Sequence, residues 1–340
     1  MLEVVRAGPL VTVQDAGRIG LRAFGVSAAG PMEPDAMVLA NALAGNTPEM
    51  AVLEFASVGG TFRATKDMYV AVTGSDAALW IDDSPARPCQ TLSLSQGQTL
   101  RVGSLGSTLW GYIAVLGGIA CDPVMGSRST QLRFALGGHL GRTLEAGDTL
   151  PVGPCTAPPS LRKATSRPAS SALAEIRVLL GPQDDFFSQE VLTRFLSAYY
   201  SVSPKFDRMA MTLEGPSLEA EKGHDIVSDG TLPGSIQVPG SGVPLVLMAE
   251  GQTTGGYPKI ATVIGADLPR LAQLRPGTRL SFKAVTLDEA ENALVTSRKA
   301  TRAMLSSLGS ADPIQPTSER LLSVNLISGV WPEDEASPNG

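Results

Sequence analysis

The stretch QTTGGYPKIATV, from Gln252 to Val263, lies between two apolar runs and decides how the second half of the chain is organised. The run VPLVLMA, residues 243–249, leads into it, and IATVI, residues 260–264, leads out of it. Short apolar runs joined by a glycine-containing stretch are typical of buried β-strands. The stretch holds two threonines, two glycines, a tyrosine, a proline and a lysine, so we ask whether it is only a turn or also binds a ligand.

Short apolar runs separated by glycine continue along the whole chain. The 340 residues are 43% apolar and include 36 Gly and 25 Pro, which is expected where many turns join short strands. We therefore predict a mainly β fold with a few helices, divided into two β-rich subdomains. In the first of these, the clearest predicted strands are residues 2–5, 61–64, 68–73, 78–81, 99–102 and 110–115.

Three segments carry helix signals. Pro34 stands at a first helical position, and Gly45 stands where that helix would end. A second helix is predicted over residues 184–196. Thr286 and Glu289 have the spacing of a capping box, which predicts a long helix that Gly309 is placed to stop.

One segment is rich in Pro, Ser and Ala and is the best candidate for a linker, namely residues 156–174. We therefore place one β-rich subdomain at residues 1–155 and a second, with its closing helix, at 175–310. Residues 311–340 form a C-terminal extension, whose polar tail we predict to be disordered.

Composition and the absence of certain motifs exclude several classes of function. The net charge of −6 argues against nucleic acid as a partner, and three separated cysteines favour a reducing compartment. The N-terminus lacks a signal peptide pattern, and the most apolar segment, residues 109–120, is too short to span a membrane, so we expect a cytoplasmic protein that uses no membrane. There is no P-loop, no biotinylation motif, no amidase nucleophile region and no spacing of metal ligands, so we predict no metal site in the chain itself.

Polar residues gather next to glycine at five places. These are TVQDAGR (12–18), GSRST (126–130), SPKFDR (203–208), GTLPGSIQVPGS (230–241) and the opening stretch. Backbone N–H groups at such turns, together with Arg or Lys, bind a carboxylate, a phosphate or a developing oxyanion. The candidate anion- and substrate-binding residues are Arg18, Arg128, Ser129, Thr253, Thr254, Gly255, Gly256 and Tyr257.

The opening stretch is the strongest of these candidates. Gly255 and Gly256 let the backbone approach a ligand without interference from a Cβ atom. Tyr257 precedes Pro258, which stiffens the turn and leaves a cis peptide bond open. Lys259 then stands at the start of a buried strand, where it can act as a fixed electrostatic clamp. The candidate catalytic residues are Lys259, Asp207, Arg208 and Asp15.

Taken in order, these stretches resemble one known family. The matching sequences are TVQDAGRIG, GPMEPDAMVLANALAGN, RSTQLR, LGGHLGRTLEAGD, GPQDDFF, VSPKFDRMAMTLEGP, GSIQVPGSG and QTTGGYPKIATVIGADLPRLAQLRPG. They extend over about residues 2 to 285. On them the chain is identified as a member of the KipA-like family, also described as biotin-dependent carboxyltransferase subdomain A/B, the C subunit of 5-oxoprolinase or allophanate hydrolase subunit 2.

The resemblance implies a fold, partners and an activity. It implies a cyclophilin-like β-barrel and an active site shared with a KipI-like partner, the B subunit, with a LamB/YcsF-like A subunit of the complex as a third component. The implied reaction is an ATP-dependent opening of the 5-oxoproline lactam, with ATP and Mg²⁺ bound in the complex. A chain without an attached biotin carboxylase fits this function.

Two alternatives stay open. In the first, the chain is a carboxyltransferase subunit that moves a carboxyl group from carboxybiotin, held on a separate carrier, to urea or a related amide; there Asp15 or Asp207 would orient the acceptor. In the second, it is a regulator that binds a KipI-like protein without catalysis. The intact set of polar residues weighs against the regulator.

Overall fold

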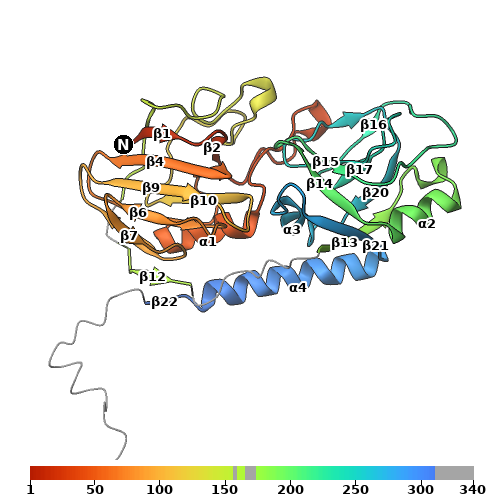
Figure 1. Cartoon of the computed structure of the whole chain (residues 1–340). Helices are drawn as coiled ribbons and strands as arrows, with labels where there is room; N and C mark the ends of the chain where they lie inside the picture. The colour runs from red at the N-terminus through yellow and green to blue at the C-terminus, as the bar shows by residue number, and fades with distance from the viewer. Residues whose placement is uncertain (156–158, 165–173, 311–340) are drawn as a thin grey trace, which may run out of the picture.

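Two antiparallel sheets form the first half of the structure, a computed structural model that describes residues 1–155, 159–164 and 174–310 (Figure 1). The first sheet has the order β11 (Thr149–Leu150), β1 (Leu2–Ala7), β4 (Val58–Ala64), β9 (Thr99–Ser104), β6 (Leu79–Ile81) and β7 (Ser84–Ala86). The second has the order β2 (Val11–Gln14), β3 (Val52–Ala56), β10 (Trp110–Val115), β5 (Met68–Thr73) and β8 (Thr91–Leu94). We call this half the first unit.

The core of the first unit follows from the alternation of side chains along its strands. Leu2 and Val4 of β1 are buried in the same apolar cluster as Ile113 and Val115 of β10. Strand β10 is buried along its whole length because helix α1 (Pro34–Ala44) covers the other face, where it meets Tyr112. The helix begins with Pro34 and ends at Gly45, which has a positive φ of 85°, so its predicted limits are confirmed.

A closed barrel of seven strands forms the second unit. Around the barrel the order is β13 (Ala174–Leu180), β20 (Lys259–Val263), β17 (Ser235–Gln237), β18 (Leu245–Leu247), β15 (Ala210–Glu214), β14 (Tyr200–Phe206) and β21 (Arg279–Ala284), and β21 returns to β13. The last pair is parallel and the others are antiparallel. The mainly β fold with two β-rich units, one of them a barrel, is confirmed.

Two small ladders and the remaining helices complete the structure. Two small ladders pair β12 (Arg162–Lys163) with β22 (Gly309–Ser310) and β16 (Asp229–Gly230) with β19 (Thr254–Gly255). The other helices are α2 (Gln189–Ser197), α3 (Leu268–Ala272), α4 (Leu287–Ser306) and three 3-10 turns, η1 (Arg22–Phe24), η2 (Leu132–Phe134) and η3 (Asp184–Phe186).

The helix predicted over residues 184–196 is broken in two. Turn η3 ends at Phe186, and α2 begins only after Ser188, whose Oγ accepts a hydrogen bond from Val191 N at 3.3 Å. Phe187 lies between them in an extended conformation, with its side chain in the barrel core. The prediction of one continuous helix was wrong because Ser188 starts a new helix as its N-cap.

Helix α4 links the two units. The predicted capping box is present, with Thr286 Oγ1 accepting from Glu289 N and the Glu289 carboxylate accepting from Thr286 N. In Figure 1 the helix runs from β21 of the barrel back to the first unit. There Met304 and Leu308 pack against the apolar cluster around α1. It ends at Ser306, three residues before the predicted stop, and serves both units instead of the barrel alone.

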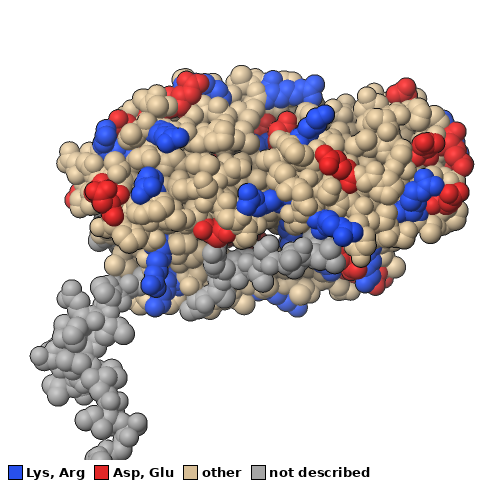
Figure 2. All heavy atoms as spheres, in the orientation of Figure 1, with Lys and Arg blue, Asp and Glu red and all other residues tan. Residues whose placement is uncertain are grey.

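The two units also share an apolar interface. Met32, Leu109 and Trp110 of the first unit belong to the same buried cluster as the barrel core. Acidic and basic side chains are interspersed on the face shown in Figure 2.

The predicted subdomain boundaries stay predictions. Most of the expected linker at 156–174 and the whole extension at 311–340, with its predicted disordered tail, lie outside the described residues.

Across the part of the chain that the structure describes, none of the helices combines the length and the apolar character needed to cross a membrane.

Candidate active site between the two units

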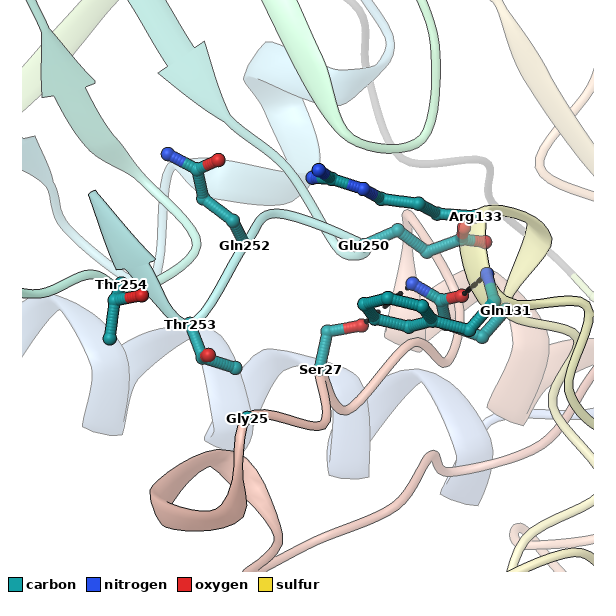
Figure 3. A pocket seen from close by; sticks show the side chains of 9 residues that line it. Gly25, Ser27, Gln131, Arg133, Glu250, Gln252, Thr253 and Thr254 are labelled. Atoms are coloured by element: carbon teal, nitrogen blue, oxygen red, sulfur yellow. Dashed lines mark hydrogen bonds between the residues drawn. The ribbon is translucent and has the colours of Figure 1, made fainter. Parts of the chain in front are cut away.

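A cavity of about 340 Å³ lies where loops of the first unit meet a loop of the barrel. This volume is in the range of small-molecule sites. Figure 3 shows Ser27 and Gln131 on one side and Gln252 with Thr253 on the other. The lining residues are Gly25, Ser27, Gln131, Arg133, Phe134, Glu250, Gln252, Thr253 and Thr254.

One wall of the cavity is fixed by the cap of a short turn. The Gln131 Oε1 atom accepts a hydrogen bond from Phe134 N at 2.7 Å and so closes η2. Its Nε2 atom donates to Ser27 Oγ at 3.3 Å, as the dashed lines in Figure 3 mark. The amide and the hydroxyl are therefore held in place at the cavity surface.

Glu250 joins the cavity to a buried charge cluster. Its Oε2 accepts from Leu132 N at 2.9 Å, and its Oε1 accepts from Arg208 Nε at 2.5 Å. Arg208 is 1% exposed and also donates to Glu54 Oε1 and, at 2.6 Å, to Gly30 O. Burial alone would lower the pKa of Arg208, but Glu54 and Glu250 outweigh it and raise the pKa. Arg208 is thus a fully paired cation that binds the barrel to the first unit.

The same cluster extends to Tyr112 and Glu33. Tyr112 OH donates to Glu54 Oε2 at 2.8 Å and accepts from Glu33 N at 2.7 Å. The Glu33 carboxylate accepts a hydrogen bond from the Gln273 side chain of α3. Burial raises the pKa of Glu33 to about 7, although the Gln273 bond opposes this. We call Arg208, Glu54, Glu250, Tyr112 and Glu33 the junction cluster.

Asp15 occupies a different cluster, where two distant turns meet. It accepts from Ser127 Oγ and Arg128 N at 2.5 Å each, from Ser129 Oγ at 2.7 Å and from Gly17 N at 2.9 Å. Burial alone would raise the pKa of Asp15, but these hydrogen bonds outweigh it and hold the pKa below its usual range. The structure therefore brings together the predicted residues Asp15, Arg128 and Ser129.

Arg18 is a buried cation with one free donor. Its Nε donates to Val124 O at 3.1 Å and its Nη2 to Ser127 O at 3.5 Å, whereas Nη1 has no hydrogen-bond partner among the described residues. Burial lowers the pKa of Arg18, and the charges of Asp15 and Glu250 oppose this without forming an ion pair. A buried guanidinium with a free N–H group suits an anion.

The stretch that opened the sequence analysis forms the barrel side of the cavity. Thr253 and Thr254 line it, and Gly255 is buried in the short ladder of β19 with β16. Gly256 O accepts a hydrogen bond from Ile226 N at 2.8 Å, and Tyr257 is partly exposed at 39%. Among the described residues the one cis peptide bond precedes Pro182, so the bond before Pro258 is trans.

Lys259 lies behind this stretch. It is 2% exposed, and its Nζ donates to Asp229 Oδ2 at 2.8 Å. Gln183 holds both residues, because its Nε2 donates to Asp229 Oδ2 at 3.1 Å and its Oε1 accepts from Lys259 N at 3.2 Å. Asp229 pairs with Gly255 in the ladder, next to Thr254 of the cavity wall, whereas Lys259 itself does not line the cavity.

Asp207 lies apart from these groups. It is exposed, and its Oδ1 accepts hydrogen bonds from Met209 N at 2.7 Å and Ala210 N at 2.9 Å. This is the geometry of a side chain that holds a turn. Its predicted catalytic role stays a prediction.

Sequence reasoning did not select several residues of the cavity wall. Gln131 and Gln252 belong to the quoted stretches RSTQLR and QTTGGYPKIATV, and Ser27 and Glu250 lie next to quoted stretches, so position within or beside these stretches was the signal that could have found them. In the described ranges no three His, Cys, Asp or Glu residues are grouped so as to hold a metal ion.

Known proteins resemble this chain over most of its length. Residues 24–284 match the family described as "Carboxyltransferase domain, subdomain A and B". The chain is 37% identical over 296 residues to the C subunit of 5-oxoprolinase from Escherichia coli strain K12, and the match covers 86% of this chain and 94% of that protein. It is 28% identical over 311 residues to urea amidolyase of Lachancea kluyveri, and that match covers 84% of this chain and 17% of that protein.

A solved structure shows the same fold. The crystal structure of the K. lactis urea amidolyase matches with a TM-score of 0.82 and 24% identity. The match covers 94% of this chain and 20% of that chain, so this chain spans about a fifth of that protein.

Proposed function

The chain belongs to the family of carboxyltransferase domains, subdomains A and B, and from this membership we propose that it is a subunit of an ATP-dependent 5-oxoprolinase-type amidohydrolase. The observation that carries the proposal is the alignment with the C subunit of the E. coli 5-oxoprolinase, which extends over 94% of that protein at 37% identity. The reaction would open the lactam of 5-oxoproline: water adds to the carbonyl carbon, the C–N bond breaks, and the nitrogen takes up a proton.

The cavity suits the binding of a small amide. Hydroxyl groups of Ser27, Thr253 and Thr254 and the amides of Gln131 and Gln252 line it. Such groups hold and orient a polar substrate by hydrogen bonds. They do not by themselves activate water or the carbonyl, which is why we propose a non-autonomous subunit that shares its active site with a KipI-like partner, the B subunit of the complex.

Lys259 is the proposed catalytic cation. Its ammonium group is buried and donates to Asp229, which pairs with Gly255 next to the cavity-lining Thr254. A fixed cation at this place stabilises negative charge that develops on the carbonyl oxygen as water adds. The hydrogen bond to Asp229, which Gln183 Nε2 also contacts, keeps the Lys259 side chain oriented, so little reorganisation is needed.

ATP with Mg²⁺ is proposed as the energy source in the complex, and it supplies the free energy for opening a stable lactam. The free Nη1 donor of buried Arg18 fits a phosphate oxygen, because the guanidinium has no carboxylate within ion-pair distance among the described residues. Arg128, whose backbone N–H binds Asp15, supplies a second guanidinium group. These two residues would hold part of the nucleotide, and the partner protein would hold the rest.

The test is purification of the assembled complex from its native cells through a tag on this chain. Mass spectrometry should find a KipI-like and a LamB/YcsF-like protein, and the complex should form glutamate from 5-oxoproline with ATP present. Matched reactions without ATP, or without this chain, should form none. A complex of all three proteins that leaves 5-oxoproline intact would contradict the proposal.

Carboxyl transfer is the second candidate function. The 28% identity to the L. kluyveri urea amidolyase over 84% of this chain favours it. In this function the same cavity would take the acceptor amide, urea or a relative, and carboxybiotin would arrive on a separate carrier. A streptavidin blot of the purified complex separates the two, because a biotinylated protein that copurifies is expected for carboxyl transfer alone.

A further inference from the structure

Three buried polar atoms without a hydrogen-bond partner among the described residues surround one backbone segment, at Thr231 and Gln252–Gly255. They are Nη1 of Arg22 and both amide atoms, Oε1 and Nε2, of Gln237. Buried polar groups nearly always have a partner, because an unpaired one loses its hydration without replacement. The segment that they surround lines the cavity at Gln252, Thr253 and Thr254, so a ligand bound there could supply the missing partners.

Gln237 reaches this segment from inside the barrel. It is 0% exposed on β17 and lies opposite Lys259 in the register of β17 with β20. Its amide packs directly against Gly255, where any Cβ atom would collide with Gln237 Nε2. Glycine at position 255 is therefore what allows the amide to reach the inner side of the segment.

Gln252 connects Gln237 to the cavity. Its Nε2 atom lies 3.1 Å from the point where a Cβ of Gly255 would stand, the point that Gln237 Nε2 also approaches. Gln252 lines the cavity as well. The Gln252 side chain therefore lies between the cavity and the amide of Gln237.

Arg22 reaches the same segment from the first unit. Its Nη2 donates to Thr231 O at 2.6 Å and to Gln252 O at 3.1 Å. No carboxylate of the described residues lies within ion-pair distance of its guanidinium, and burial lowers its pKa. Arg22 is therefore a cation whose charge the described part of the chain leaves unbalanced, next to loop residues that line the cavity.

We infer that Gln237 and Arg22 form the recognition site for a small cyclic amide that carries a carboxylate. The Gln237 amide matches the –CO–NH– edge of a lactam, because its oxygen accepts from the lactam N–H and its nitrogen donates to the carbonyl. Arg22 pairs with the carboxylate. The ligand displaces the Gln252 amide from the cavity wall.

This inference deepens the proposed function, on which it rests, because it assigns the substrate class to named residues. 5-Oxoproline carries both groups on one five-membered ring. Urea has the amide but no carboxylate, so Arg22 would discriminate against it. Gln237 and Arg22 are thus proposed as specificity-determining residues of the same site.

The test uses the assembled complex with three ligands. 5-Oxoproline is the substrate, 2-pyrrolidinone is a competitor with the lactam alone, and cyclopentanecarboxylate is a competitor with the carboxylate alone. The variants are Arg22→Met and Gln237→Leu, with Arg87→Met and Gln96→Leu as controls at exposed positions of the first unit. Arg22→Lys keeps the charge and should retain part of the affinity.

A crossed pattern is expected. Arg22→Met should lower kcat/KM for 5-oxoproline about 10- to 100-fold and weaken cyclopentanecarboxylate similarly, with 2-pyrrolidinone unchanged. Gln237→Leu should lower kcat/KM about 10-fold and weaken 2-pyrrolidinone, with cyclopentanecarboxylate unchanged. Both controls should match the wild type.

Other outcomes overturn the inference. If a variant weakens both competitors equally, or weakens neither, its residue has a structural role or none. If the wild-type complex does not open 5-oxoproline at all, the proposed function fails and this inference fails with it. An active wild type with unaffected variants overturns the inference alone.

Discussion

Two arginines, Arg208 and Arg22, bind the same loop at Glu250 and Gln252. They differ in whether their own charge is paired. Arg208 donates to the Glu250 side chain, to Glu54 and to a backbone carbonyl, so its charge is balanced within the junction cluster. Arg22 donates to Gln252 O and Thr231 O, and its buried Nη1 has no partner among the described residues. A fully paired buried cation fixes the geometry of its surroundings, whereas an unbalanced one attracts an anion.

The difference separates support from recognition. The junction cluster joins the barrel to the first unit and presents one wall of the cavity through Glu250. The segment at residues 252–255 presents the other wall, and the unpaired atoms lie behind it. Changes in the junction cluster should therefore alter stability first, and changes around the segment should alter activity first.

Removing the Arg208 guanidinium from the junction cluster should have the largest effect on stability. Arg208→Met leaves the buried Glu54 and Glu250 carboxylates without their cation, which should cost about 3–5 kcal/mol of unfolding free energy. The loss should shrink at low pH, because burial raises the pKa of Glu54 and its carboxyl group takes up a proton there. Urea denaturation at pH 5 and pH 8 measures the loss of unfolding free energy and its change with pH. Arg63→Met, which breaks a partly exposed pair with Glu3, is the control and should cost less than about 1 kcal/mol.

Glu33 gives the junction cluster a pH dependence. Because burial raises its pKa from 4.5 to about 7, the folded chain keeps a proton between these values that the unfolded chain has released. Stability should therefore fall by about 3 kcal/mol as the pH rises through that window. Glu33→Gln removes this titration, so the difference in unfolding free energy between the two proteins should change with pH. A constant difference from pH 4.5 to 8 would contradict the prediction.

Lys259→Met should change activity and leave stability alone. Loss of the fixed cation should lower kcat of the complex about 100-fold. The melting temperature should stay close to that of the wild type, because the Asp229 side chain is 50% exposed and can be hydrated when unpaired. Lys283→Met, in an exposed pair with Glu175, is the matched control. Full activity in Lys259→Met would remove this residue from the site.

Gly255→Ala should have the smallest effect and the most local one. The added methyl group collides with the Gln237 amide, which should cost about 1–2 kcal/mol of stability. In a Gln237→Ala background the same change should cost little, and the double-mutant cycle measures this coupling. Gly256→Ala is the control, because the nearest atom to its Cβ would be Ile226 O at 3.7 Å. Equal costs of Gly255→Ala in both backgrounds would argue against the contact.

The sequence predicted those features that depend on neighbouring residues. Pro34 marks the start of α1 because the N–H of a first helical residue has no partner in the helix, so proline loses nothing there. Gly45 marks its end because the residue after a helix often takes a positive φ, which glycine adopts without strain. The capping box at Thr286 predicted the start of α4 for a similar reason. The N-cap at Ser188 was missed because this residue lies within a run of residues whose pattern is helical throughout.

The site was harder to predict because its contacts join distant parts of the chain. Asp15 and Ser127 are 112 residues apart, and Arg208 and Glu54 are 154 apart. A charged residue next to glycine has the same local pattern whether it faces a cavity or a buried partner. Arg208 was selected as a catalytic candidate on this local pattern, and the structure pairs it completely within the junction cluster. Its catalytic role stays a prediction.

Helix α4 has a consequence for the order in which the protein is made. Met304 and Leu308, near its end, cover the apolar cluster at α1, which is synthesised more than 250 residues earlier. While the ribosome is still translating the barrel, the nascent first unit carries an uncovered apolar surface. This surface is covered only after the barrel has emerged from the exit tunnel, so the nascent first unit is exposed to aggregation until α4 has been made.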